Sequence, residues 1–384
     1  IRITNPARLA IYYAAYFGVI GILMPFWPMW LEAKGLGAVE IGFILASAPF
    51  VRAIASPLIA QSADRRGVRR PIMIALTATA SVSFAAFHFI NGFWPIILVT
   101  VLFFMLFSAS QPLAESLTMH IVRKEGANYG RIRLWGSITF ILAAILGGHV
   151  LEGRDPHVIF YLSLSGLGIL FATCIFVPNS RFPNDTGEEF PVLKLLKIRP
   201  FVWMLIAAAL IQSSHAVVYG FSTIHWKSIG YSESLIGILW AEGVVAEIIL
   251  FQYSALVLKR ISPAMLIVLA AVAGVIRWTI MGNTDFLPAL FFAQALHGLT
   301  FGAAHLGAIH YISDTIPANL SATAQSLLSA VVMGIAIGLT TMISGVLYSA
   351  IGSHAYFPMA GMAVVSAIVG LVLYFKVQGK FEGD

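Results

Sequence analysis

Charged residues are scarce in this chain. They make up 10% of the 384 residues, whereas 59% are hydrophobic and the mean hydropathy is +0.88. A soluble globular domain carries about 25% charged residues. The shortage of charge therefore excludes a soluble globular protein and indicates an integral membrane protein, with the lipid bilayer as its surroundings.

Cysteine and catalytic motifs are also missing. Cys174 is the only cysteine, which excludes an intramolecular disulfide and any CxxC metal site. No HExxH motif, phosphate-cradling glycine loop or Ser/His/Asp set occurs in a suitable context, so we expect neither an enzyme nor a cofactor. The histidines form no HxxxH pair with a third acidic ligand, so no metal site is expected.

Long apolar stretches are what the chain has in abundance. A membrane-spanning helix needs about 20 mostly apolar residues. Twelve stretches qualify: 9–31, 39–60, 72–90, 94–119, 134–151, 158–177, 201–223, 235–258, 263–281, 286–312, 324–350 and 356–377. We expect an N-terminal six-helix bundle (1–177), a cytoplasmic linker (178–200) and a C-terminal six-helix bundle (201–384).

The positions of lysine and arginine predict the orientation. With the N-terminus in the cytoplasm, inside segments hold 18 of the 23 basic residues and outside segments hold three, Lys34, Arg154 and Lys227. This asymmetry predicts two cytoplasmic termini in the inner membrane. It also explains the net charge of +6 without a nucleic-acid partner.

The two halves resemble each other when one is shifted by 195 residues. Gly35, Ile41 and Gly42 then fall on Gly230, Ile236 and Gly237. Chance agreement between apolar helices is the alternative explanation. Two repeated six-helix bundles are the arrangement expected of a rocking transporter.

The few charges within or beside the spans are hypotheses about function, because ionisable groups in hydrocarbon are expensive. Glu115 and Arg133 bracket the charged turn between the fourth and fifth spans. Arg52 lies about 20 Å into the second span, where it could hold a carboxylate or pair with Glu32. Glu242 and Glu247 lie on the eighth span, about 140° apart around the helix. Either could carry a proton, or Glu247 could pair with Arg277.

The loop after the second span resembles the loop that marks the major facilitator superfamily. It reads Asp64-Arg65-Arg66-Gly67-Val68-Arg69-Arg70, an acid followed by basic residues and a turn glycine. The resemblance implies a conformational loop of Asp64, Arg65, Gly67 and Arg69. Ala60 stands where that family usually has glycine, and the corresponding 258–261 loop lacks the acid.

Two residue pairs resemble those of lactose-permease-like carriers. Glu115 and Arg133 are 18 residues apart within a segment ending YGRIRLWGS, and Arg277 and His297 are 20 apart. The resemblance implies that these residues contact substrate or couple protons. Thr300 replaces the family's proton-carrying glutamate and Gln294 its lysine, so the proton must be carried elsewhere.

A closer resemblance, over nearly the whole chain, is to the phenylpropionate permease family. The segments that carry it include GILMPFWPMWL, SSHAVVYGFSTIHW and ALHGLTFGAAHLGAIHYI. It implies small organic solutes, with aromatic carboxylates as one class.

The sequence thus predicts an all-α carrier of twelve spans that works by alternating access, functional as a monomer, for proton-coupled uptake of a small organic acid. Sugar or nucleoside symport, uniport, efflux and a non-transporting receptor are the alternatives. Predicted substrate-binding residues are Glu115, Arg133, Arg52, His297, Tyr219 and Trp240. Predicted proton-coupling residues are Glu247, Glu242, Arg277 and His297.

Overall fold

The computed structural model describes residues 3–179 and 192–378, without the side chains of 60, 64–66, 318–319, 322 and 377–378. Every secondary-structure element in these residues is a helix, which confirms the all-α prediction. Residues 180–191, most of the predicted linker, lie outside the described part of the chain, as do the side chains of Asp64 and Arg65.

The first half of the chain forms six long helices, each apolar enough to cross a membrane. Short connections join them, and a 3₁₀ turn (Ala86–His88) extends the third helix. The helices are α1 (Asn5–Ala33), α2 (Ala38–Arg66), α3 (Arg70–Ala85), α4 (Phe93–Glu125), α5 (Tyr129–Leu151) and α6 (His157–Phe176).

The second half makes six more passes, several of them interrupted. Single helices form the third pass, α12 (Pro263–Asn283), and the last, α17 (Tyr356–Gln378). The short α7 (Val192–Leu196) precedes these passes. The composite passes are α8 (Arg199–Ser213) with α9 (Ala216–Ser228), α10 (Glu233–Gln252) with α11 (Ser254–Leu258), α13 (Leu287–Ala295) with α14 (Ala304–Thr315), and α15 (Ala318–Leu328) with α16 (Ile337–Ile351).

A break at Gly352 separates the last two passes. The apolar helical stretch Thr323–Lys376 is 54 residues long, about 80 Å at 1.5 Å per residue, far more than the roughly 30 Å of hydrocarbon. Gly352 has φ of +56°, a left-handed conformation that ends α16, and a 3₁₀ turn leads into α17. The described helices therefore make twelve passes, as the sequence predicts.

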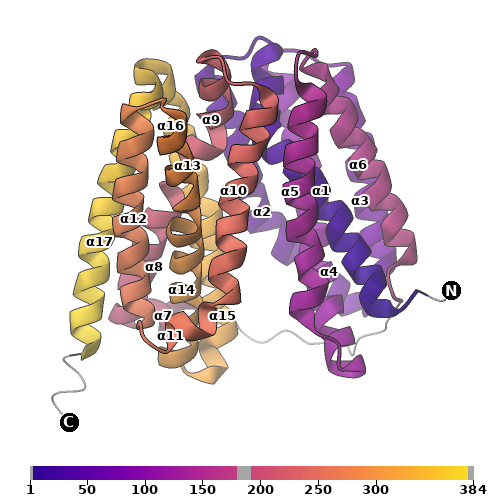
Figure 1. Ribbon diagram of the computed structural model, residues 1–384. Coiled ribbons are helices and arrows are strands. Elements are labelled where there is room, and N and C mark those ends of the chain that lie inside the picture. The colour runs from indigo at the N-terminus through magenta and orange to yellow at the C-terminus, as the bar shows by residue number, and fades with distance from the viewer. Residues whose placement is uncertain (1–2, 180–191, 379–384) are drawn as a thin grey trace. The chain divides into compact units, whose positions relative to one another are not determined.

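The chain divides into two compact units, residues 1–188 with 230–241, and residues 189–229 with 242–384. In the first unit α1 packs against α5 and α6, and α2 packs against α4. In the second unit α12 and α17 run side by side, and α17 also packs against α8 (Figure 1). Aromatic rings in mutual contact fill the core of the first unit: Trp27 stacks on Trp30, and Phe84 packs edge-to-face against Phe87.

Equivalent positions of the two halves have the same local structure. Gly35 after α1 and Gly230 after α9 both have a positive φ, +80° and +95°. Their counterparts six residues later, Ile41 and Ile236, are both buried. The repeat deduced from the shift of 195 residues therefore extends to backbone conformation and burial.

Close packing of α1 on α5 gives a test of this fold. A Cβ added at Gly21 would lie 2.6 Å from the backbone oxygen of Phe140, whereas one added at Gly18 meets nothing within 4 Å. We expect Gly21→Ala to destabilise the protein by about 1–3 kcal/mol and Gly18→Ala to be neutral. Cys174 is free and fully buried, so a thiol-reactive dye should report a lower unfolding midpoint for Gly21→Ala alone. Equal midpoints would contradict this packing.

Candidate functional site

The ends of α4 and α5 place Glu115 and Arg133. Asn128 caps α5, its side-chain oxygen accepting a hydrogen bond from the Arg131 backbone N–H at 2.9 Å. Helix α5 therefore begins at Tyr129, five residues before the apolar stretch, and Arg133 lies within the helix. Helix α4 continues to Glu125 and ends at Gly126, whose φ is +65°. Both side chains thus project from regular helices.

Arg133 and Glu115 meet in the first unit. Arg133 Nε lies 3.8 Å from Glu115 Oε1, and both side chains are about 30% exposed. The other carboxylate oxygen of Glu115 accepts a hydrogen bond from the Tyr129 hydroxyl at 2.8 Å. The guanidinium also stacks 3.9 Å from the centre of the Phe17 ring, and a Cβ at Gly136 would lie 2.9 Å from its Nη1. The Phe17 ring therefore packs against one face of the Arg133 guanidinium, and the missing side chain of Gly136 makes room for it.

Arg52 adds a second cation to this unit. It is exposed, and Nη2 donates to the neutral Gln111 Oε1 at 3.2 Å. Within the described residues no carboxylate lies at ion-pair distance from Arg52, so the proposed pair with Glu32 does not form. Tyr16 is within electrostatic reach of Arg52, Arg133 and Glu115. Two guanidinium groups and one carboxylate leave this cluster with a net positive charge.

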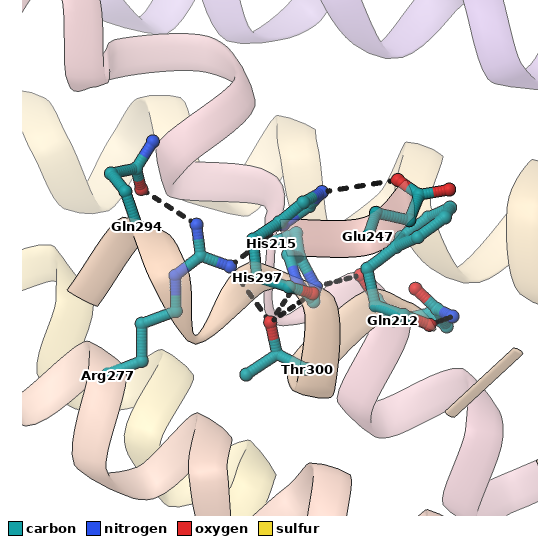
Figure 2. A network of polar contacts seen from close by, with 8 residues as sticks. Gln212, His215, Glu247, Arg277, Gln294, His297 and Thr300 are labelled. Atoms are coloured by element: carbon teal, nitrogen blue, oxygen red, sulfur yellow. Dashed lines mark hydrogen bonds and ion pairs between the residues drawn. The ribbon is translucent and has the colours of Figure 1, made fainter. Parts of the chain in front are cut away.

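Arg277 is the centre of the polar network in the second unit. Its side chain is 1% exposed, and Nη2 donates to Gln294 Oε1 at 2.8 Å. Nη1 lies 2.9 Å from Thr300 Oγ1 and 3.0 Å from His297 Nδ1 (Figure 2). The two residues that depart from the lactose-permease pattern, Gln294 and Thr300, thus supply neutral oxygen acceptors to a buried cation.

The contacts of Arg277 fix the tautomer of His297. A guanidinium only donates, so His297 Nδ1 must accept, its proton sits on Nε2 and the ring is neutral. His215 Nδ1 lies 3.1 Å from the Ile211 carbonyl oxygen, so it carries a proton. His215 Nε2 lies 3.0 Å from Thr300 Oγ1, which accepts from Arg277 and has a second acceptor within reach, the His297 carbonyl oxygen at 3.4 Å.

A π-helical turn, Gly298–Ala303, carries Thr300 and directly follows His297. Such turns inside α-helices occur frequently at functional sites. Gln212 of α8 donates its Nε2 to the carbonyl oxygen of Phe301 in this turn at 3.1 Å. Gly298 lets this turn lie close to the backbone of α10, because a Cβ at position 298 would lie 2.6 Å from the Ala246 carbonyl oxygen.

The glutamates of α10 occupy different surroundings. Glu247 Oε2 lies 3.9 Å from His297 Nε2, and its side chain is 24% exposed (Figure 2). Glu242 Oε2 is buried and has no hydrogen-bond partner among the described residues.

Tyr219 stacks on His215 with ring centres 5.6 Å apart. Trp240 is buried and belongs to the first unit.

The predicted conformational loop is described in part. Gly67 has φ of +63°, which suits a tight reversal between α2 and α3. Arg69 is buried just before α3 begins at Arg70. A role for this loop in conformational change stays a prediction. Among the described residues, no group of three or more His, Cys, Asp or Glu side chains could hold a metal ion.

Twelve apolar passes, with a cluster of charged and polar side chains inside each unit, define a multi-pass membrane protein of the carrier class. The chain belongs to the MFS_1 like family, whose family model matches residues 7–359. It is a transporter of the major facilitator type and not an enzyme.

Similar proteins span almost the same length. The chain is 34% identical over 368 residues to a protein of Escherichia coli (strain K12) named a probable 3-phenylpropionic acid transporter, covering 93% of this chain and 94% of that one. It is 26% identical to the maltose permease of Geobacillus stearothermophilus, over 95% and 93% of the two chains. The crystal structure of the nucleoside transporter NupG has the same fold, with a TM-score of 0.84 at 16% identity, covering 97% of this chain and 99% of that one.

Proposed function

We propose that the protein takes up a small organic acid across the inner membrane, driven by the proton gradient and working by alternating access. Both termini face the cytoplasm, as the distribution of lysine and arginine predicts. One molecule suffices for transport, because a single chain carries both polar clusters.

The observation that carries the proposal is the surplus of cations in the first unit. Arg52 is exposed and donates to a neutral amide, while Arg133 faces Glu115 at 3.8 Å, beyond the length of a hydrogen bond. Guanidinium groups recognise carboxylates with charge-assisted, often bidentate hydrogen bonds. The partly exposed Phe17 ring beside Arg133 provides apolar surface for an aromatic group. The name of the E. coli relative points to the same substrate class.

The second unit supplies the proton-coupling groups in this proposal. Glu247 faces the Nε2–H of His297, whose other nitrogen accepts from Arg277. A proton that arrives on Glu247 removes its attraction for His297 and so changes the balance of charge around Arg277. A buried ionisable network of this kind can favour different conformations in its two protonation states. Glu242 is the second choice for the proton, because its buried Oε2 has no partner in the described chain.

A sugar or nucleoside substrate is the second candidate. The maltose permease and NupG are named for such solutes, and Glu115, Gln111 and Tyr129 could bind hydroxyl groups. A neutral polyol would, however, leave the surplus positive charge of Arg52 and Arg133 without a counter-charge.

Counterflow separates these substrates. Liposomes that contain the purified protein and unlabelled 3-phenylpropionate are expected to take up labelled 3-phenylpropionate faster than protein-free liposomes, and maltose or uridine should not compete. The protein-free liposomes control for diffusion of the neutral acid through the bilayer. Competition by maltose or uridine, without specific exchange of 3-phenylpropionate, would instead support the second candidate.

A further inference from the structure

Tyr129 contacts the Glu115–Arg133 pair from the start of α5. It is the first residue of that helix, and its side chain is partly buried. The Tyr129 hydroxyl donates to Glu115 Oε2 at 2.8 Å. The Arg133 guanidinium also lies near this hydroxyl. One neutral hydroxyl group therefore faces both the carboxylate and the cation of the pair.

The ion pair itself is loose. Arg133 Nε lies 3.8 Å from Glu115 Oε1, whereas a charge-assisted hydrogen bond between these groups is about 2.7–2.9 Å long. An arginine and a carboxylate that meet freely often form two parallel hydrogen bonds, which use both carboxylate oxygens. Here the second oxygen of Glu115 is held by Tyr129. The hydroxyl and the guanidinium thus compete for one carboxylate, and the hydroxyl makes the shorter contact.

The other neighbours of Arg133 leave its charge unbalanced. The guanidinium packs 3.9 Å from the centre of the Phe17 ring and 5.6 Å from that of Tyr13, and both rings are neutral. In the part of the chain that the structure describes, Glu115 is the one acid at ion-pair distance from Arg133. The Arg133 side chain is 29% exposed. How firmly Glu115 pairs with it therefore decides how well an outside anion can bind there.

We propose that Tyr129 is a positioning residue, which holds Glu115 away from Arg133 and so leaves the guanidinium open to the carboxylate of a substrate. Glu115 then acts as an internal anion that competes with the substrate, and not as a substrate contact. The identity of the substrate rests on the proposed function, whereas the competition of Tyr129 and Arg133 for Glu115 does not.

Binding of labelled 3-phenylpropionate to the purified protein, measured by equilibrium dialysis, tests this role. Tyr129→Phe lets Glu115 close on Arg133, so the affinity should fall about three- to fivefold, as expected for one part-exposed ion pair. Glu115→Gln should bind at least as tightly as the unaltered protein, and adding Tyr129→Phe to it should change nothing. A merely structural role of the hydroxyl would weaken binding in both backgrounds. Tyr161→Phe, the same change at an exposed position of α6, is the control and should bind normally.

The reactivity of Arg133 tests the same role without substrate. Phenylglyoxal modifies guanidinium groups, and peptide mass spectrometry compares its rate at Arg133 with that at the exposed Arg131. We expect modification of Arg133 to slow about threefold in Tyr129→Phe, and not to slow when Glu115→Gln is also present. Unchanged reactivity in Tyr129→Phe, or weaker 3-phenylpropionate binding in Glu115→Gln, would overturn the proposal. The expected reactivities in a protein that binds no 3-phenylpropionate would instead contradict the proposed substrate and uphold the role of Tyr129.

Discussion

Glu247→Gln is expected to abolish accumulation of substrate against its gradient while leaving counterflow intact. Glutamine has the size of glutamate and keeps an oxygen facing His297 Nε2, which lies 3.9 Å from the carboxylate, but it cannot take up a proton. Transport that needs no net proton movement should therefore continue. The measurement is uptake of labelled 3-phenylpropionate into energised vesicles, compared with counterflow in the same preparation, and we expect at least a tenfold loss in the first alone.

Glu242→Gln is the matched control, since it makes the same change five residues earlier on α10. The two positions point about 140° apart around the helix, and only Glu247 is seen beside His297. We expect Glu242→Gln to retain accumulation. If the two results are reversed, the proton belongs on Glu242; if both variants accumulate substrate normally, α10 does not carry the coupling proton.

Arg133→Gln is expected to weaken substrate binding by about tenfold to a hundredfold. A hydrogen bond to a charged group contributes about 1.5–3 kcal/mol, and each 1.4 kcal/mol corresponds to a factor of ten in affinity. The effect should appear in KM more than in the maximal rate, because the substitution removes a binding contact and leaves the second unit intact. Initial rates of 3-phenylpropionate counterflow over a range of concentrations measure both values.

Arg133→Lys separates charge from geometry at this position. Lysine keeps the positive charge but loses the flat guanidinium that stacks 3.9 Å from the Phe17 ring centre. We expect a KM between those of the unaltered protein and Arg133→Gln. Arg131→Gln, an exposed position two residues earlier, should leave KM unchanged. A KM for Arg133→Gln that equals that of the unaltered protein would remove this arginine from the substrate site.

Hydropathy was sufficient to predict the twelve passes, because a bilayer demands long apolar helices. The starts of α12 at Pro263 and of α17 at Tyr356 agree with the predicted ones. Helix α5 begins five residues before the apolar stretch that predicts it, since the caps and first turns of helices are polar and carry no hydropathy signal. The π-helical turns were not predicted, because they change the hydrogen-bond register without altering composition.

By resemblance to a family, the sequence grouped Glu115 with Arg133 and Arg277 with His297 as candidate site residues, without predicting direct contacts. In the structure Glu115 and Arg133 lie 3.8 Å apart, and Arg277 lies 3.0 Å from His297. Gln294 and Thr300 depart from the family pattern in sequence, and nothing in the sequence indicates that they are the neutral partners of Arg277. Their roles depend on how α12 and the π-helical turn pack, and short polar side chains give no distinctive signal in an apolar helix. The roles of all these residues in transport remain predictions.

Substrate-dependent proton movement tests the proposed coupling most directly. The purified protein is placed in liposomes that contain a pH-sensitive dye, at a pH where nearly all 3-phenylpropionate is ionised, and substrate is then added outside. We predict acidification of the interior that is faster than in protein-free liposomes and in liposomes containing Glu247→Gln. Specific entry of labelled 3-phenylpropionate at the same rate with and without Glu247, and with no added proton flux, would contradict proton-coupled uptake.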